Sequence, residues 1–179
     1  SGIAKDQIRT AFLRHATSKI SNAEDLNRIA SLGFRGEALS SIAAVARVEL
    51  ITKTREDLMG CRYLIEGSKE LLSEEVGAPD GTTFLIKDLF FNTPARRKFL
   101  KTPQTEGSHI QDMMEKLALS HPDISFKFIN QNQIRLQTSG NGNEKDLIYH
   151  IYGRDITSLL LPIEKSNELF SLKGYIGKP

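Results

Sequence analysis

The chain has 179 residues, which corresponds to about 1.2 domains at a typical size of about 150 residues. Its 39% hydrophobic and 26% charged residues exclude wholesale disorder, and no apolar run approaches the roughly 18 residues of a membrane-spanning helix. A net charge of +2 is too small for a protein that coats nucleic acid over its whole surface, so any basic function has to be local.

Cysteine and histidine offer little chemistry. Cys61 is the single cysteine and cannot form an internal disulfide, which favours a reducing compartment. The 4 histidines are scattered and show no metal-ligand spacing with Cys61. Ser1 follows no initiator methionine and begins no signal peptide, so we expect an internal segment of a longer protein.

Helices are predicted for most of the first 46 residues. Apolar residues at helical spacing from Ile8 to Phe12 predict a helix over residues 6–20, with His15 half-buried on the same stripe. A capping-box pattern at residue 21 predicts a short second helix that ends at Gly33. Good helix formers over residues 37–46 predict a third helix, which starts directly after Gly36.

The middle of the chain alternates apolar and polar residues. This pattern predicts strands over residues 47–54 and 61–66, and a third strand over 82–88 follows a turn-rich stretch. We expect an antiparallel meander. Residues 66–80 carry five acidic side chains against one lysine, a net −4, and are expected on the solvent side of a hairpin. Thr93 and Pro94 are typical of the N-cap and first residue of a helical turn.

The last third repeats the mixture of helix and strand. A longer helix is predicted to reach about His121, followed by strands over 124–129 and 134–138. Residues 139–143 contain no apolar side chain and are expected to be a linker. Beyond it we expect a short helix that ends at Gly153, then strands near 156–163 and 169–176. The pattern as a whole predicts an α+β fold.

The stretch from Gly33 to Leu39 is the most informative candidate site. Its two glycines precede a helix, and the unpaired N–H groups of a helix's first turn attract anions. Such a stretch can cradle a phosphate. The same residues could also form a helix C-cap followed by an ordinary turn, and spacing by itself does not decide between the two.

Two further stretches carry positive charge. Arg14 to Lys19 offers two hydroxyls and a lysine, which could ligate phosphate oxygens or complement a helix dipole. Residues 94–101 hold four basic residues and no acidic one, which could contact a nucleic-acid backbone or form a solvated helix face. No catalytic triad, Walker loop or paired-carboxylate site is present in the sequence.

Three blocks together resemble the MutL family of DNA mismatch repair ATPases. In chain order they are RHATSKI from Arg14, SLGFRGEAL from Ser31, and DLFFNTPARRKFL from Asp88. MutL proteins belong to the GHKL group, with gyrase-type topoisomerases, chaperones and histidine kinases. The resemblance implies a Bergerat two-layer α/β sandwich with a mixed sheet. It also implies ATP between the helices and a lid formed by about residues 14–36.

The resemblance places specific residues at the nucleotide. Gly2 matches the last glycine of the adenine-site motif, and Thr82 matches the threonine that supports adenine recognition. The residues implied to bind the cofactor are Gly2, Thr17, Ser18, Lys19, Gly33, Phe34, Arg35, Gly36, Glu37, Ala38, Leu39 and Thr82. The residues expected to contact DNA are Arg96, Arg97, Lys98 and Lys101.

The family's general-base glutamate, adenine-binding aspartate and Mg²⁺-binding asparagine match no residue here and are expected before Ser1. We therefore expect residues 1–140 to be a GHKL ATPase domain without its N-terminal part, and residues 144–179 to begin a second, ribosomal-protein-like domain. No catalytic residue and no metal ligand is assigned to this chain. We expect the chain by itself to hydrolyse no ATP.

The resemblance implies an ATP·Mg²⁺-dependent DNA repair ATPase that hydrolyses ATP slowly. Lid closure and homodimerisation would couple a mismatch-recognition protein of the MutS type to a downstream nuclease or helicase. The protein would act on DNA, and no membrane is expected to take part. The expected location is the bacterial cytoplasm, or the nucleus if the source is eukaryotic. The alternatives are a DNA-binding module of the same protein and another GHKL ATPase, such as a topoisomerase subunit.

Overall fold

The computed structural model describes residues 2–17 and 35–178. The chain divides into two compact units, residues 1–100 and 101–179. The first unit contains, in chain order, η1 (Lys5–Gln7), α1 (Ile8–Ala11), α2 (Ala38–Val45), β1 (Arg47–Lys53), β2 (Gly60–Glu66), β3 (Lys69–Val76), β4 (Gly81–Lys87) and α3 (Pro94–Arg97). The second contains α4 (Pro103–Ser120), β5 (Lys127–Asn130), β6 (Gln133–Gln137), α5 (Glu144–Ser158), β7 (Leu160–Ser166) and β8 (Ser171–Gly177).

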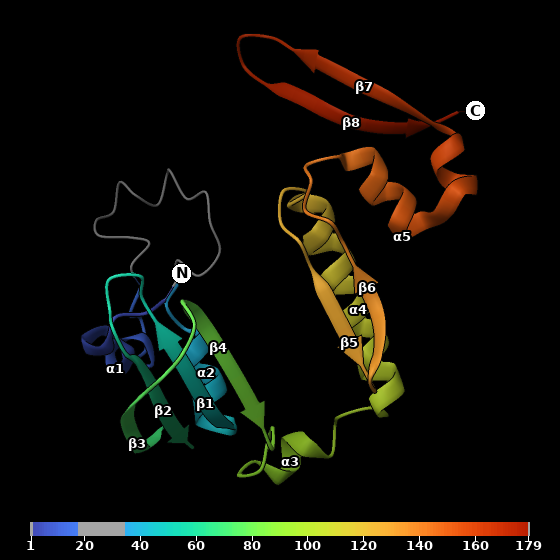
Figure 1. The fold of residues 1–179 in the computed structure, drawn as a ribbon. Helices are drawn as coiled ribbons and strands as arrows, with labels where there is room; N and C mark the ends of the chain where they lie inside the picture. Colours follow the sequence, from blue (N-terminus) through green and yellow to red (C-terminus); the bar gives the residue numbers. More distant parts are fainter. Residues whose placement is uncertain (1, 18–34, 179) are drawn as a thin grey trace. The chain divides into compact units, whose positions relative to one another are not determined.

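The first unit is a helix layer on a four-stranded sheet (Figure 1). The strand order is β3-β2-β1-β4, and every pairing is antiparallel. The predicted strands and the α+β class are confirmed. The predicted meander is wrong in one respect, because β4 pairs with β1 rather than with the strand before it. The acidic stretch of residues 66–80 contains strand β3, which pairs with β2 and has no buried residue, as expected for the solvent side of a hairpin. The resemblance implied a mixed sheet, whereas the pairings in the described residues are antiparallel.

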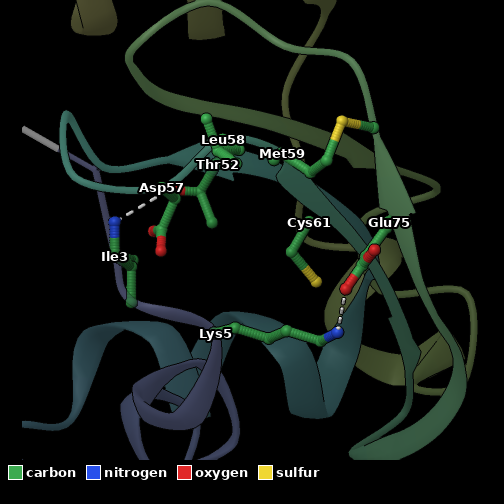
Figure 2. A pocket seen from close by; sticks show the side chains of 9 residues that line it. Ile3, Lys5, Thr52, Asp57, Leu58, Met59, Cys61 and Glu75 are labelled. Carbon is green, nitrogen blue, oxygen red and sulfur yellow. Dashed lines mark hydrogen bonds and ion pairs between the residues drawn. The ribbon is translucent and has the colours of Figure 1, made fainter.

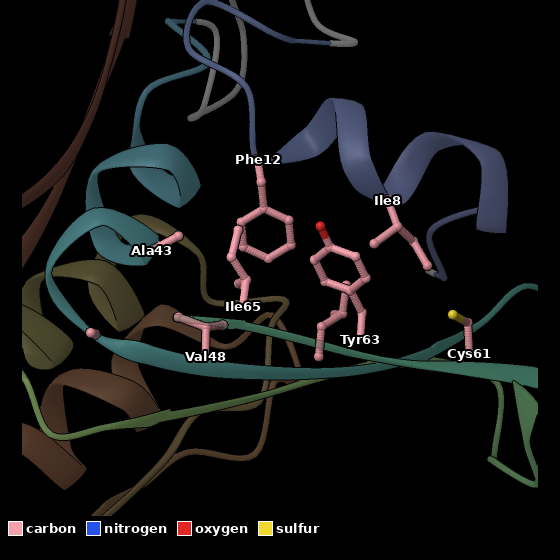
Figure 3. Packing of buried hydrophobic residues seen from close by; sticks show 9 residues of the cluster. Ile8, Phe12, Ala43, Val48, Cys61, Tyr63 and Ile65 are labelled. Carbon is pink, nitrogen blue, oxygen red and sulfur yellow. The ribbon is translucent and has the colours of Figure 1, made fainter. Parts of the chain in front are cut away.

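The core of the first unit lies between α1, α2 and one face of β1 and β2 (Figure 3). Alternation along β1 buries Val48, Leu50 and Thr52, because successive side chains of a strand point to opposite faces. From α1, Ile8 is 1% exposed, and Phe12 stacks on Tyr63 of β2 with ring centroids 5.5 Å apart. This explains the apolar stripe read from the sequence.

On the opposite face of the sheet, ion pairs link neighbouring strands. Arg62 on β2 bonds Glu49 on β1 at 2.7 Å and Glu74 on β3 at 3.0 Å. Lys87 on β4 lies 3.8 Å from the second oxygen of Glu49. These pairs cross all four strands, and they explain why polar residues alternate with apolar ones along β1 and β2.

The second unit has a smaller core of its own. Buried Ala118 of α4, Leu136 of β6 and Leu147 of α5 meet there. The predicted linker, residues 139–143, ends at the N-cap of α5, which is Asn143. The side-chain oxygen of Asn143 accepts hydrogen bonds from the N–H groups of Lys145 and Asp146. Gly153 interrupts α5 with φ 80°, but helix continues to Ser158. Residues 156–158 are therefore helical, not part of the predicted strand.

Two ion pairs fasten the N-terminal segment to β3. Lys5 bonds Glu75 at 2.8 Å, and Arg9 makes a bidentate contact with Glu70 at 2.7 and 2.8 Å. The hydrogen bond from Arg9 lowers the pKa of Glu70 to about 2. Burial, and then its hydrogen bond to Glu70, raises the pKa of Tyr63 to about 12. The Arg9–Glu70–Tyr63 network joins α1, β3 and β2.

We expect Arg9→Gln to lower the free energy of unfolding near neutral pH. The difference in this free energy between the variant and wild type should become smaller as the pH falls. Ionised Glu70 stabilises the folded state because its pKa lies below the unfolded value. That contribution is present above about pH 4.5 and is lost as the pH falls towards about 2. Urea unfolding followed by circular dichroism between about pH 7 and pH 2 measures it. Arg96→Gln, an exposed arginine without an ion pair in the described residues, is the control. If the loss of unfolding free energy in Arg9→Gln is the same at every pH, the ion pair with Glu70 is not its cause.

Candidate functional site

The phosphate-cradle candidate leads into α2. Gly36 has φ 61°, and a Cβ there would collide with the backbone carbonyl of Ala16. Glu37 is the N-cap of α2 and makes no side-chain cap hydrogen bond. The first-turn N–H groups have no acceptor within the helix, and Ala38 is exposed. The positive end of α2 is therefore accessible to an anion.

The second predicted phosphate-binding stretch meets this glycine. Ala16 packs directly against Gly36, so Thr17 and Arg35 approach the same place from both ends of residues 18–34. His15 Nδ1 lies 3.4 Å from Glu37 Oε1, and the His15 side chain is 77% exposed. The prediction of a half-buried His15 is wrong, because α1 ends at Ala11.

Part of the predicted cofactor set cannot be placed. Ser18, Lys19, Gly33 and Phe34 lie outside the described residues, as does the predicted second helix. Of the rest, Thr17, Arg35, Gly36, Glu37, Ala38 and Leu39 lie around the start of α2.

Gly2 and Thr82, predicted at the adenine end, come together at the end of β1. A Cβ on Gly2 would collide with the backbone carbonyl of Lys53, so only glycine permits this approach. Thr82 lies opposite Thr52 in the β1–β4 register, and their hydroxyl oxygens are 3.0 Å apart. The backbone N–H of Ile3 donates to the Thr52 hydroxyl at 2.8 Å (Figure 2). Sequence reasoning missed Thr52, since a threonine in an alternating strand carries no motif signal.

A cavity of about 300 Å³ opens beside Thr52 (Figure 2). Its wall includes the Lys5–Glu75 ion pair, which raises the pKa of Lys5 and lowers that of Glu75. Cys61, 4% exposed, also lines it. The lining residues are Ile3, Lys5, Thr52, Asp57, Leu58, Met59, Gly60, Cys61 and Glu75. The cavity thus combines an apolar wall with hydroxyl and charged groups, as small-molecule sites do.

The candidate DNA-contacting residues form an exposed basic stretch. Arg96 and Arg97 belong to α3, Lys98 is its C-cap, and Lys101 is the first residue of the second unit. All four side chains are exposed, and within residues 2–17 and 35–178 none of them makes an ion pair. Thr93 stands at the N-cap as predicted, but its hydroxyl makes no cap bond and is buried without a hydrogen-bond partner among the residues that the structure describes.

The residues before α3 close the C-terminal end of α2. The side chain of Asn92 donates to the Ala44 carbonyl at 2.9 Å, and the N–H of Phe90 donates to the Val45 carbonyl at 2.7 Å. Arg47 pairs with Asp88 at 3.1 Å and lies over the Phe91 ring at 5.3 Å, which holds this loop to β1. The loop of residues 88–93 therefore has a structural role, because it satisfies carbonyls at the end of α2.

Within the part of the chain that the structure describes, no helix is long and apolar enough to cross a membrane. No group of three His, Cys, Asp or Glu side chains in these residues could hold a metal ion. Among the described residues there is thus no such cluster for the Mg²⁺ ion that the resemblance implies.

Comparisons with known proteins agree with the sequence blocks. No family model matches the chain. It is 71% identical over 178 residues to the DNA mismatch repair protein MutL of Agathobacter rectalis, covering 99% of this chain and 28% of that protein. It is 49% identical over 177 residues to MutL of Clostridium botulinum, covering 99% of this chain and 26% of that protein. The chain thus spans about a quarter of the length of these curated relatives.

Solved structures show the same fold. The MutL ATPase domain of Aquifex aeolicus complexed with ADP matches with a TM-score of 0.66 and 26% identity, over 81% of this chain and 56% of that one. The N-terminal domain of a DNA repair protein matches with a TM-score of 0.72 and 24% identity, over 97% of this chain and 55% of that one. The resemblance to the MutL ATPase region and the predicted fold class are confirmed.

We expect Asn92→Ala to lower the free energy of unfolding by about 0.5–1 kcal/mol, because the Ala44 carbonyl loses its side-chain donor. Thr93→Val, one residue along, removes a buried hydroxyl that has no partner and should leave stability unchanged or raise it. Chemical denaturation of both variants and wild type measures the two effects. Equal losses in both variants would show that the loop is sensitive to any substitution.

Proposed function

We propose that this chain forms the nucleotide-binding part of a DNA mismatch repair ATPase. The observation that carries the proposal is the exposed N-terminus of α2, preceded by a glycine with φ 61° that packs on Ala16. A helix N-terminus stabilises phosphate oxygens through free N–H groups and its dipole. Similarity to a MutL ATPase domain that is complexed with ADP supports an adenine nucleotide as the ligand.

In this proposal the described residues would contact the nucleotide at both of its ends. The Gly36 to Leu39 backbone would receive the phosphates, with Thr17 and Arg35 beside it and Ser18, Lys19, Gly33 and Phe34 on the adjoining stretch. Gly2 and Thr82 would lie at the adenine. ATP supplies the phosphoanhydride bond that water cleaves, and the chain's own groups hold the phosphates and stabilise their charge. Mg²⁺ would be bound in the complete protein, and no step is assigned to it here, since the described residues offer no site.

We propose that nucleotide binding in the complete protein closes a lid formed by about residues 14–36 and favours a homodimer. This switch would relay mismatch detection by a MutS-type protein to a nuclease or helicase. The bacterial relatives support a cytoplasmic location. The similarity to MutL ATPase domains favours this reading over a topoisomerase subunit.

DNA contact is a second proposed activity of the same protein. It is supported by the exposed side chains of Arg96, Arg97, Lys98 and Lys101, which make no ion pair with the described residues. Guanidinium and ammonium groups that are free of protein carboxylates can neutralise phosphates without breaking an existing pair.

We expect Gly36→Ala to weaken ATP binding by the complete protein at least about tenfold. An added Cβ would both strain a backbone at φ 61° and collide with the Ala16 carbonyl, which displaces the start of α2. Gly142→Ala is the matched control, since Gly142 has φ 76° but no atom near its Cβ position. Equilibrium titration with a fluorescent ATP analogue measures both. Unchanged affinity in Gly36→Ala removes the cradle assignment.

We expect the double variant Arg96→Ala, Arg97→Ala to bind DNA more weakly and to lower the salt dependence of binding. Each lost phosphate contact reduces the slope of log affinity against log salt by about 0.9. The control removes two exposed basic residues elsewhere, Lys145 and Arg154, which make no ion pair within the described residues. DNA titrations at several salt concentrations distinguish a specific basic stretch from a general charge effect. Identical slopes for the two double variants refute the assignment.

A further inference from the structure

Thr52 is the most completely buried hydroxyl near the proposed site. It is 1% exposed on β1, between β2 and β4 in the sheet. The core-facing positions before it, Val48 and Leu50, are apolar, and a valine would suit a residue that only packs. A buried hydroxyl costs free energy unless hydrogen bonds compensate for it, so its bonds identify its role.

The hydroxyl of Thr52 joins two segments that are distant in the sequence. It accepts from the N–H of Ile3 at 2.8 Å, donates to the Gly81 carbonyl at 3.2 Å, and lies 3.0 Å from the Thr82 hydroxyl. All three neighbours belong to, or adjoin, the residues proposed to hold the adenine, Gly2 and Thr82. The side chain of Thr52 thus links the N-terminal segment at Ile3 to the start of β4 at Gly81 and Thr82.

Gly81 and Thr82 are also held by the β1–β4 pairing, opposite Lys53 and Thr52, so the N-terminal segment depends more on the Thr52 hydroxyl. Gly2 packs against the Lys53 carbonyl at the end of β1. Because glycine has no side chain, it makes no side-chain contact that could hold this segment in place. Ile3 and Thr52 then form one wall of the 300 Å³ cavity (Figure 2). Loss of the hydroxyl would remove the partner of the Ile3 N–H at this wall and a donor to the Gly81 carbonyl, and the N-terminal segment could then move away from the end of β1.

We propose that Thr52 is a positioning residue that fixes the base-recognising end of the nucleotide site. This inference rests on the proposed function. Thr52 acts through Ile3, Gly81 and Thr82, which adjoin or belong to the residues proposed to hold the adenine, whereas Gly36 acts at the phosphates. Substitutions at the two positions should therefore have different effects on selectivity between nucleotide bases.

The test uses the complete protein and measures dissociation constants for ATP and GTP in wild type, Thr52→Val, Thr52→Ser and Gly36→Ala. Thr52→Val keeps the shape of the side chain and removes the hydroxyl. We expect it to lower the preference for ATP over GTP about fivefold, the effect of about one hydrogen bond. Thr52→Ser keeps the hydroxyl and should retain the preference. Gly36→Ala should weaken both nucleotides by the same factor.

The ratio of the two constants does not depend on how much of a variant is folded, so a loss of stability cannot imitate the expected result. An unchanged ATP preference in Thr52→Val overturns the role of Thr52, and so does a loss in Thr52→Ser as large as that in Thr52→Val. If Gly36→Ala binds ATP normally, or the wild type binds no nucleotide, the proposed function itself fails, and the role of Thr52 fails with it.

Discussion

The alternation of side chains along β1 is the constraint on which the first unit depends. One face of this strand carries Val48 and Leu50 into the core under α1 and α2, and the other carries Glu49 into the ion pairs that link β1 to β2 and β4. Thr52 continues the buried face to the end of the strand. Because Thr52 lies on the same face of β1 as Val48 and Leu50, its hydroxyl is buried beside the candidate nucleotide site.

Helix α2 has the candidate phosphate site at its N-terminal end and the loop of residues 88–93 at its C-terminal end. Its N-terminus has no side-chain cap. Its C-terminus is closed by Asn92 and by the N–H groups of Ser68 and Phe90. Satisfying the carbonyls at one end holds the helix in place, so the N–H groups at the other end stay oriented towards a ligand.

Local patterns in the sequence identified most elements of the fold and part of the candidate site. Alternation located β1, β2 and β4, because the period of two reflects burial on one face. It did not reveal β3, whose exposed acidic residues contact Lys5 and Arg9 across the fold. It also could not show that β4 pairs with β1, since strand order depends on which edges meet in space. The predicted stripe extended to His15, whereas α1 ends at Ala11, and Phe12, its C-cap, stacks on Tyr63 of β2.

The sequence by itself determined the family resemblance, the α+β class, the glycine-rich start of α2 and the basic block at residues 94–101. These are properties of neighbouring residues, and short motifs preserve them. Only the tertiary structure decided that Gly2, Thr52 and Thr82 converge, that Gly36 packs on Ala16, and that Asn92 closes α2. Each of these depends on residues at least 20 positions apart meeting at hydrogen-bonding or van der Waals distance, and no local pattern encodes such a distance.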